Sequence, residues 1–161
     1  MAVLTSNIIQ TTLPKRTVAY ISHTGPYKGD TELFESLFNK VMAWAIPMGV
    51  LNDPHTQSVS IYQDEDVPED QQTIKVGFTV PEDTEVEGPI EKMELPAGNY
   101  VVGAFKLLPT EYGDAWNEVY EFVYKNNLKP LSGIMYESYK NDPSTHPEGK
   151  HLVDICIGLQ G

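Results

Sequence analysis

A carboxylate stands among aromatic and thioether side chains near the end of the chain, in Met135-Tyr136-Glu137-Ser138-Tyr139. Because side chains alternate along a strand, Met135, Glu137 and Tyr139 share one face. A buried carboxylate is costly unless a cation or a hydrogen-bond donor meets it. Glu137 is therefore a candidate counter-charge for a cationic ligand, or a general base that activates water. In the alternative interpretation, Glu137 is solvated and Tyr136 points to the core.

Aromatic rings near this carboxylate would add cation–π attraction of about 0.5–2 kcal/mol each. Tyr139 shares its face and is the first candidate for a pocket wall. Trp116 lies on the apolar stripe of a predicted helix, and Tyr62 and Tyr136 each lie on the first strand after a helix, so core packing is the alternative for these three. Tyr27 follows Gly-Pro at a helix entry, as a pocket rim or a hydrophobic staple. Two tyrosines are weaker candidates: Tyr112 and Tyr120.

Composition excludes several classes of function. The chain has 161 residues, 40% of them hydrophobic and 21% charged, as in an ordinary globular protein. Its net charge of −12 repels nucleic-acid phosphates and favours cationic or neutral ligands, or a basic protein partner. We therefore expect no direct binding of nucleic acid.

No cofactor is expected either. The four histidines lack metal-ligand spacing and there is one cysteine, so no metal site is predicted. No glycine-rich phosphate loop and no serine nucleophile elbow occur. We see no signal peptide, and no apolar run approaches the ~20 residues that span a bilayer. The lone cysteine, Cys156, suits a reducing compartment, so a cytoplasmic protein without membrane association is expected.

Hydrophobic periodicity predicts the order strand, helix, strand, strand in each half of the chain. Residues 1–16 are predicted to be an extended arm or an edge strand, and Pro47 and Gly49 to end the first helix. The acidic, Pro- and Gly-containing residues 82–97 are the predicted linker, in which residues 90–95 could add an edge strand. The predicted elements are strands at 17–22, 58–62, 73–80, 99–106, 131–139 and 152–159, and helices from about 30 to 45 and from Thr110 to Asn126.

The predicted fold is α+β, a single domain over residues 1–161 built from two βαββ repeats, about 15–81 and 98–160. Two helices would cover antiparallel sheets about a pseudo-twofold axis, with a ligand pocket at the junction of the repeats. The equivalence of Tyr62 and Tyr136 supports this duplication, although the order of elements carries most of the inference.

With these motifs the chain resembles the GyrI-like small-molecule-binding domain, which is also the effector-binding half of AraC- and MerR-type multidrug-responsive regulators. The resemblance covers roughly residues 15–160. It rests on His23-Thr24-Gly25-Pro26-Tyr27, Trp44, Trp116, Tyr136-Glu137-x-Tyr139-x-Asn141-Asp142-Pro143 and Asp154-Ile155-x-Ile157.

This resemblance implies that Glu137 faces a pocket lined by aromatic side chains and meets cationic, aromatic ligands. The leading expectation is a protein that senses, sequesters or detoxifies amphipathic, cationic or planar small molecules. One branch of the family looks like hydrolases of cyclopropane-bearing DNA-alkylating natural products, in which Glu137 would be catalytic. Another branch inhibits DNA gyrase, which would be a protein partner. Gly158 and Val123-Tyr124 depart from the family pattern, which leaves the type of ligand open.

Overall fold

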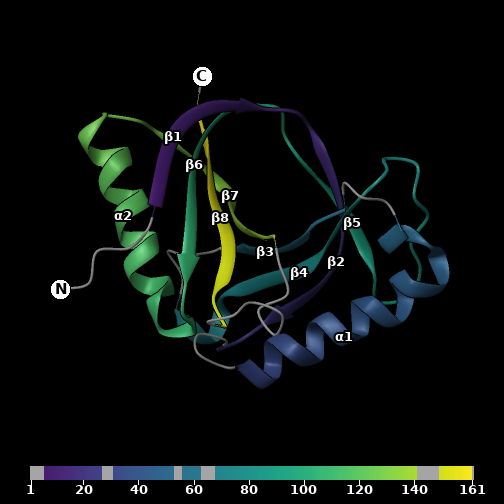
Figure 1. Ribbon diagram of the computed structural model, residues 1–161. Helices are drawn as coiled ribbons and strands as arrows, with labels where there is room; N and C mark the ends of the chain where they lie inside the picture. The colour runs from purple at the N-terminus through teal and green to yellow at the C-terminus, as the bar shows by residue number, and fades with distance from the viewer. Residues whose placement is uncertain (1–5, 27–30, 53–55, 63–67, 141–148, 161) are drawn as a thin grey trace. The chain divides into compact units, whose positions relative to one another are not determined.

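The computed structural model describes residues 6–26, 31–52, 56–62, 68–140 and 149–160. The chain divides into two compact units (Figure 1). Lys15–Pro96 forms one of them, called here the continuous unit. Met1–Pro14 and Ala97–Gly161 together form the other, called here the discontinuous unit. Each contains four antiparallel strands and one main α-helix.

The continuous unit has the sheet order β3-β4-β2-β5, with antiparallel neighbours throughout. Its edge strand β5 lies in the predicted linker, where the sequence had suggested an edge strand at residues 90–95, and it pairs with β2. The elements are β2 (Arg16–Thr24), α1 (Thr31–Met48), η1 (Val50–Asn52), β3 (Ser58–Tyr62), η2 (Glu69–Gln71), β4 (Thr73–Val80) and β5 (Glu91–Leu95).

One face of this sheet packs against α1. Alternation along β4 places a row of apolar side chains on that face, and the helical period of α1 places another row opposite them. The buried side chains of the two rows are Ile74, Val76, Phe78 and Val80 of β4, and Leu37, Val41 and Ala45 of α1. These contacts explain why the two sequence patterns predicted the elements well.

Helix α1 continues through Pro47 to Met48. The helix therefore ends three residues beyond the predicted end at about residue 45, and of the two residues predicted to end it, Pro47 lies inside the helix. Gly49 follows with a φ of +72°, and its N–H donates to the carbonyl oxygen of Ile46 at 3.1 Å. A glycine adopts this left-handed conformation without steric cost, so Gly49 is the residue that ends the helix.

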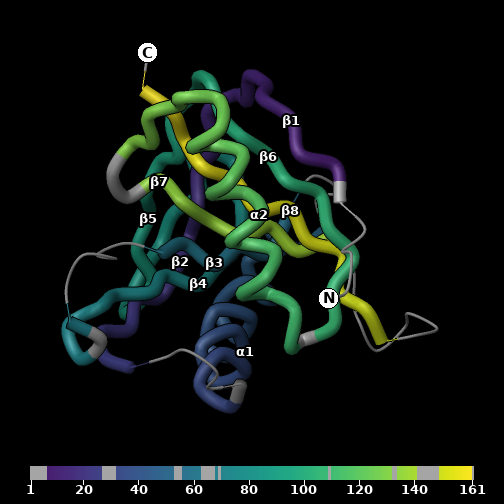
Figure 2. The backbone as a smooth tube through the Cα atoms, turned by 90° about the vertical axis from the view of Figure 1, so that its left-hand side faces the viewer, coloured from purple at the N-terminus to yellow at the C-terminus, as the bar shows by residue number. Residues whose placement is uncertain are grey.

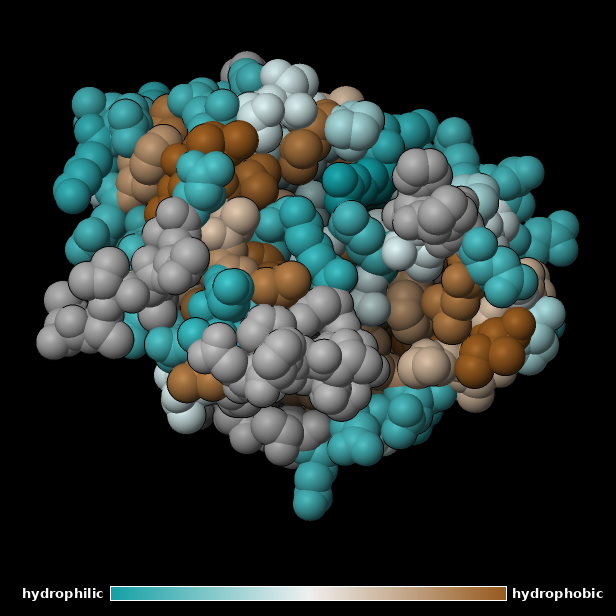
Figure 3. Space-filling view, viewed as in Figure 1, coloured by the Kyte–Doolittle hydropathy of each residue, from teal (hydrophilic) through white to brown (hydrophobic). Residues whose placement is uncertain are grey.

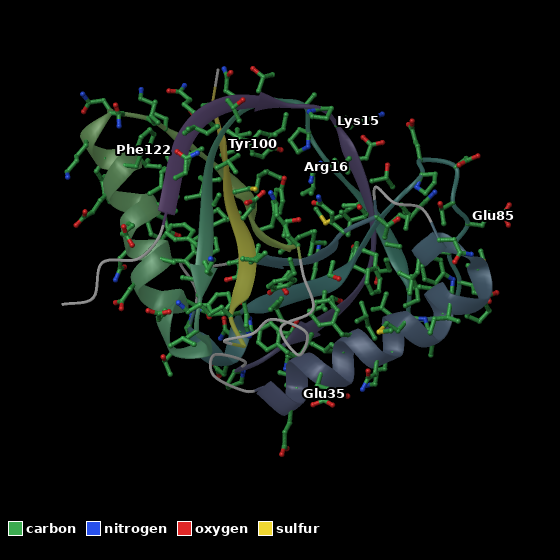
Figure 4. All side chains as sticks on the ribbon, viewed as in Figure 1. Lys15, Arg16, Glu35, Glu85, Tyr100 and Phe122 are labelled. Carbon is green, nitrogen blue, oxygen red and sulfur yellow. The ribbon has the colours of Figure 1, made fainter. Side chains whose placement is uncertain are left out.

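The outer side of α1 is polar at first and apolar toward its end. Glu35 projects away from the helix (Figure 4). Hydrophobic surface gathers over the C-terminal part of α1 (Figure 3), where Met42, Ile46 and Met48 are exposed. The helix is therefore amphipathic only over its first turns.

The discontinuous unit has the sheet order β1-β6-β8-β7, again antiparallel. The predicted edge strand near the N-terminus is confirmed as β1, which runs beside β6 (Figure 2). The sequence did not indicate this partner. The elements are β1 (Ser6–Leu13), β6 (Gly98–Leu107), η3 (Pro109–Glu111), α2 (Tyr112–Lys125), β7 (Pro130–Tyr139) and β8 (His151–Leu159).

Helix α2 covers one face of these four strands through Ala115, Val119 and Val123, which are all buried. Alternate residues of β6, β8 and β7 meet it: Val101, Phe105, Leu107, Val153, Ile155, Ile157, Met135 and Tyr139. The face of β7 that carries Met135, Glu137 and Tyr139 is therefore the face under α2.

The predicted order strand, helix, strand, strand occurs in both units, as β2-α1-β3-β4 and as β6-α2-β7-β8. The α+β class with antiparallel strands is confirmed. Within the described ranges, no helix is long and apolar enough to cross a membrane.

Candidate functional site

Glu137 lies in the interior of the discontinuous unit, with only 4% of its surface exposed. It pairs in register with Ile155 of β8 and points toward α2. Its neighbours on β7 are buried on the opposite face, since Tyr136 and Ser138 are each 1% exposed. The alternative in which Glu137 is solvated is thus excluded, because both faces of β7 are covered at this point.

Two short hydrogen bonds hold the Glu137 carboxylate. The Tyr139 hydroxyl donates to Oε1 at 2.6 Å, and Nε1 of Trp116 donates to Oε2 at 2.7 Å. Such lengths are typical of bonds to an ionised acceptor. Both donors are neutral, so these two bonds stabilise the negative charge without cancelling it. The sequence-predicted trio Glu137, Tyr139 and Trp116 is therefore brought together in one cluster.

Helix α2 carries an aromatic ladder, which we define as Tyr112, Trp116 and Tyr120, spaced by four residues. Four helical residues rise about 6 Å, close to the ~6.7 Å between alternate residues of a strand. Trp116 and Tyr120 therefore meet two successive inward-facing residues of β7. Trp116 donates to Glu137, and the Tyr120 hydroxyl donates to the sulfur of Met135 at 3.4 Å. The rings of Trp116 and Tyr120 lie 5.9 Å apart.

The first residue of the aromatic ladder bonds to the neighbouring strand. The Tyr112 hydroxyl lies 2.5 Å from Nδ1 of His151, and the two rings meet edge to face with centroids 5.5 Å apart. Burial raises the pKa of Tyr112, and the negative charge of Glu137 raises it further. Burial lowers the pKa of His151. Tyr112 therefore stays protonated at neutral pH and His151 stays uncharged.

The raised pKa of Tyr112 predicts a loss of stability in alkali. The folded chain holds this proton more tightly than the unfolded chain, whose tyrosine has the ordinary pKa of 10.0. The contribution is complete below about pH 10 and is lost as the pH rises above that value. Tyr112→Phe should remove this dependence, which urea denaturation at pH 8 and pH 10.5 would measure. Equal alkaline loss in both proteins would contradict the prediction.

The remaining predicted site residues lie elsewhere. Tyr136 faces away from α2 and contacts the ring of Tyr100, with centroids 6.3 Å apart. Tyr62 packs in the core under α1, and its register partner is Ile74. Tyr62 thus lies on the face that α1 covers and Tyr136 on the face away from α2, so the structure does not support their equivalence. Tyr27 lies outside the described residues, as does Asn141-Asp142-Pro143.

Sequence reasoning missed the role of His151, which it considered only as a metal ligand. It ranked Tyr112 and Tyr120 low, although their four-residue spacing around Trp116 predicts one helix face. That spacing is the signal that could have identified the aromatic ladder. The bond to His151 joins residues 39 positions apart and has no local signal.

Other places in the described structure are less suited to an aromatic ligand. In the part of the chain that is described, no group of three or more His, Cys, Asp or Glu side chains could hold a metal ion. A surface depression on the outer side of α1 contains no aromatic ring; it is lined by Glu32, Glu35, Ser36, Asn39, Lys40 and Ala43. The Glu137 cluster combines a buried carboxylate with several rings, so we take it as the candidate site.

The sequence matches the family described as GyrI-like small molecule binding domain over residues 6–160. It is similar to DNA gyrase inhibitor 2 of Dickeya dadantii (strain 3937). The two are 30% identical over 140 residues, which cover 82% of this chain and 83% of that relative.

Solved structures share the fold at low sequence identity. The C-terminal domain of EcmrR has a TM-score of 0.73 at 15% identity, over 96% of this chain and 98% of that domain. EcmrR in its complex with DNA has a TM-score of 0.77 at 15% identity, over 96% of this chain. The match covers 57% of the EcmrR chain in that complex. SAV2435 bound to tetraphenylphosphonium has a TM-score of 0.62 at 11% identity, over 96% of this chain and 94% of SAV2435. By the extent of the family match, the chain belongs to the GyrI-like small-molecule-binding domains.

Proposed function

We propose that this chain binds an amphipathic small molecule that is cationic or planar and aromatic, with Glu137 as its counter-charge. Sensing, sequestration or detoxification of such compounds would follow from this binding. The single observation that supports the proposal most is a carboxylate 4% exposed that accepts from Trp116 and Tyr139 and lies beside the aromatic ladder.

The chemistry around Glu137 suits a lipophilic cation. Trp116, Tyr120 and Tyr139 are each partly exposed, unlike the buried carboxylate that they surround. Ring faces attract a cation by about 0.5–2 kcal/mol each, and more when water is excluded. Weak screening inside the protein strengthens the Coulomb attraction of the carboxylate. A positive charge spread over aromatic groups would use both kinds of attraction, and it would lose little hydration on binding.

The test compares tetraphenylphosphonium with the neutral triphenylphosphine oxide by isothermal titration calorimetry. Glu137→Gln should lower the affinity for the cation by about tenfold or more, which corresponds to about 1.4 kcal/mol. The affinity for the neutral compound should change by no more than about twofold. Glutamine retains the shape of the side chain, since its oxygen can accept from Trp116 and its amide can donate to Tyr139.

Glu121→Gln is the matched control, because Glu121 is an exposed carboxylate on α2 and its loss changes the net charge equally. This variant should bind both compounds as wild type does. An equal effect of the two substitutions would contradict a specific counter-charge. If neither compound bound wild type, the small-molecule proposal would fail. A basic protein partner, such as the gyrase in the name of the Dickeya relative, would then be the better candidate.

A further inference from the structure

His151 extends the Glu137 cluster onto the adjacent strand. It begins β8, and because residues alternate, it shares the face of Val153 and Ile155. These two residues are the register partners of Tyr139 and Glu137. His151 therefore lies on the same sheet face as the carboxylate, about 13 Å farther along the strands.

Tyr112 connects the two groups. Its hydroxyl lies 2.5 Å from Nδ1 of His151, and its pKa responds to the charge of Glu137. At neutral pH the imidazole is uncharged and the tyrosine keeps its proton, so Tyr112 donates and Nδ1 accepts. The His151 proton then belongs on Nε2.

Acidification changes both the bond and the charge. An imidazolium carries protons on both nitrogens, so Nδ1 can no longer accept from Tyr112. The contact can persist only if the hydroxyl turns and accepts instead. A positive charge also appears on the sheet face that carries Glu137, where it repels a bound cation.

We propose that His151 is a specificity-determining residue that makes the affinity of the Glu137 site for cations dependent on pH. The site would bind a cation at neutral pH and bind it more weakly in acid. This inference rests on the proposed function of Glu137 and adds a regulation of that site.

His151 is the side chain on this face that gains a positive charge in acid. Among the described residues, α2 contributes Tyr112 to this face, and β7 contributes Tyr139 and Glu137. From β6 the face receives Phe105 and Leu107, which are apolar. The other charged groups of the strands are placed differently: Lys106, Lys140 and Asp154 alternate to the opposite face, and Lys150 precedes β8. On and before α2, Asp114, Glu121 and Lys125 are exposed, Glu118 is two residues from Trp116 and so on the other side of the helix, and Glu111 accepts from the backbone N–H of Leu108.

The experiment measures the binding of tetraphenylphosphonium between pH 8 and pH 5.5. Between these pH values the affinity of wild type for the cation should fall by about threefold or more beyond the fall measured for His151→Gln. This is the effect expected for a His151 imidazolium and a cation beside Glu137, two like charges about 13 Å apart under partial screening. Glutamine can still accept from Tyr112 but does not titrate. Protonation of Glu137 would weaken cation binding in both proteins, so the difference between their pH dependences gives the contribution of His151. The control variant His23→Gln, in the continuous unit, should show the same pH dependence of cation binding as wild type.

Two further readouts separate a charge from a structural role. Triphenylphosphine oxide, if it binds, should show no difference in pH dependence between wild type and His151→Gln. By reciprocity, bound tetraphenylphosphonium should lower the pKa of His151 in an NMR titration. Identical pH dependence of cation binding in wild type and His151→Gln would overturn the inference. Absence of cation binding by wild type at pH 8 would instead refute the proposed function.

Discussion

Replacing Gly77 with alanine is expected to destabilise the continuous unit by about 3 kcal/mol or more. A Cβ atom at this position would lie 1.9 Å from the carbonyl oxygen of Ala19 and 2.7 Å from Cα of Tyr20. Both are backbone atoms of β2, which pairs with β4 at Tyr20 and Gly77. No side-chain rotation can relieve such an overlap, so the two central strands of the sheet must separate.

Gly113→Ala is the matched control, because nothing lies within 4 Å of the added Cβ and the residue is helical. Alanine there should leave stability unchanged or raise it by up to about 1 kcal/mol. Urea denaturation followed by circular dichroism measures both variants. Equal denaturation midpoints for Gly77→Ala and wild type would contradict the prediction, because they would show that the strands adjust without loss of stability.

Tyr139→Phe is expected to lower the free energy of unfolding by about 2 kcal/mol, the range for a hydrogen bond to a charged group. The substitution removes only the hydroxyl that donates to Glu137 at 2.6 Å. In a Glu137→Gln background the same change should cost about 1 kcal/mol or less, because the acceptor is then neutral. Chemical denaturation of wild type, the two single variants and the double variant gives the coupling energy between Tyr139 and Glu137 directly.

The control for this cycle is Tyr124→Phe. Tyr124 lies on α2 but is 77% exposed, so loss of its hydroxyl should change stability by no more than about 0.5 kcal/mol. A purely additive cycle would mean that the bond between Tyr139 and Glu137 contributes nothing beyond the separate residues. It would also weaken the case that Glu137 is held as an anion.

The sequence predicted the elements where a local pattern determines them. The row Ile74, Val76, Phe78 and Val80 has the period of a strand, and each helix carries its apolar stripe. Strand alternation also predicted that Glu137 and Tyr139 share one face. The burial of Glu137 depends on the packing of α2 against β7, and the sequence pattern of β7 alone does not predict that packing.

Features that depend on pairing between distant residues were not predictable in this way. The face occupied by Tyr62 is set by its register with Ile74, and the opposite orientation of Tyr136 by its register with Cys156. The partner of β1 lies on β6, and the partner of Tyr112 lies at the start of β8. No local periodicity encodes such choices, because they follow from the assembly of the whole sheet.

The pairing of β1 with β6 has a consequence for synthesis on the ribosome. Leu13 emerges 98 − 13 = 85 residues before its partner Gly98. At about 5–20 residues per second, β1 waits roughly 4–17 seconds for the strand that completes its sheet. The whole of Lys15–Pro96 is synthesised during that interval and can fold first. Until then the nascent chain carries β1, with Ile8 and Ile9, without its β6 partner, and such a strand is suited to transient chaperone contact.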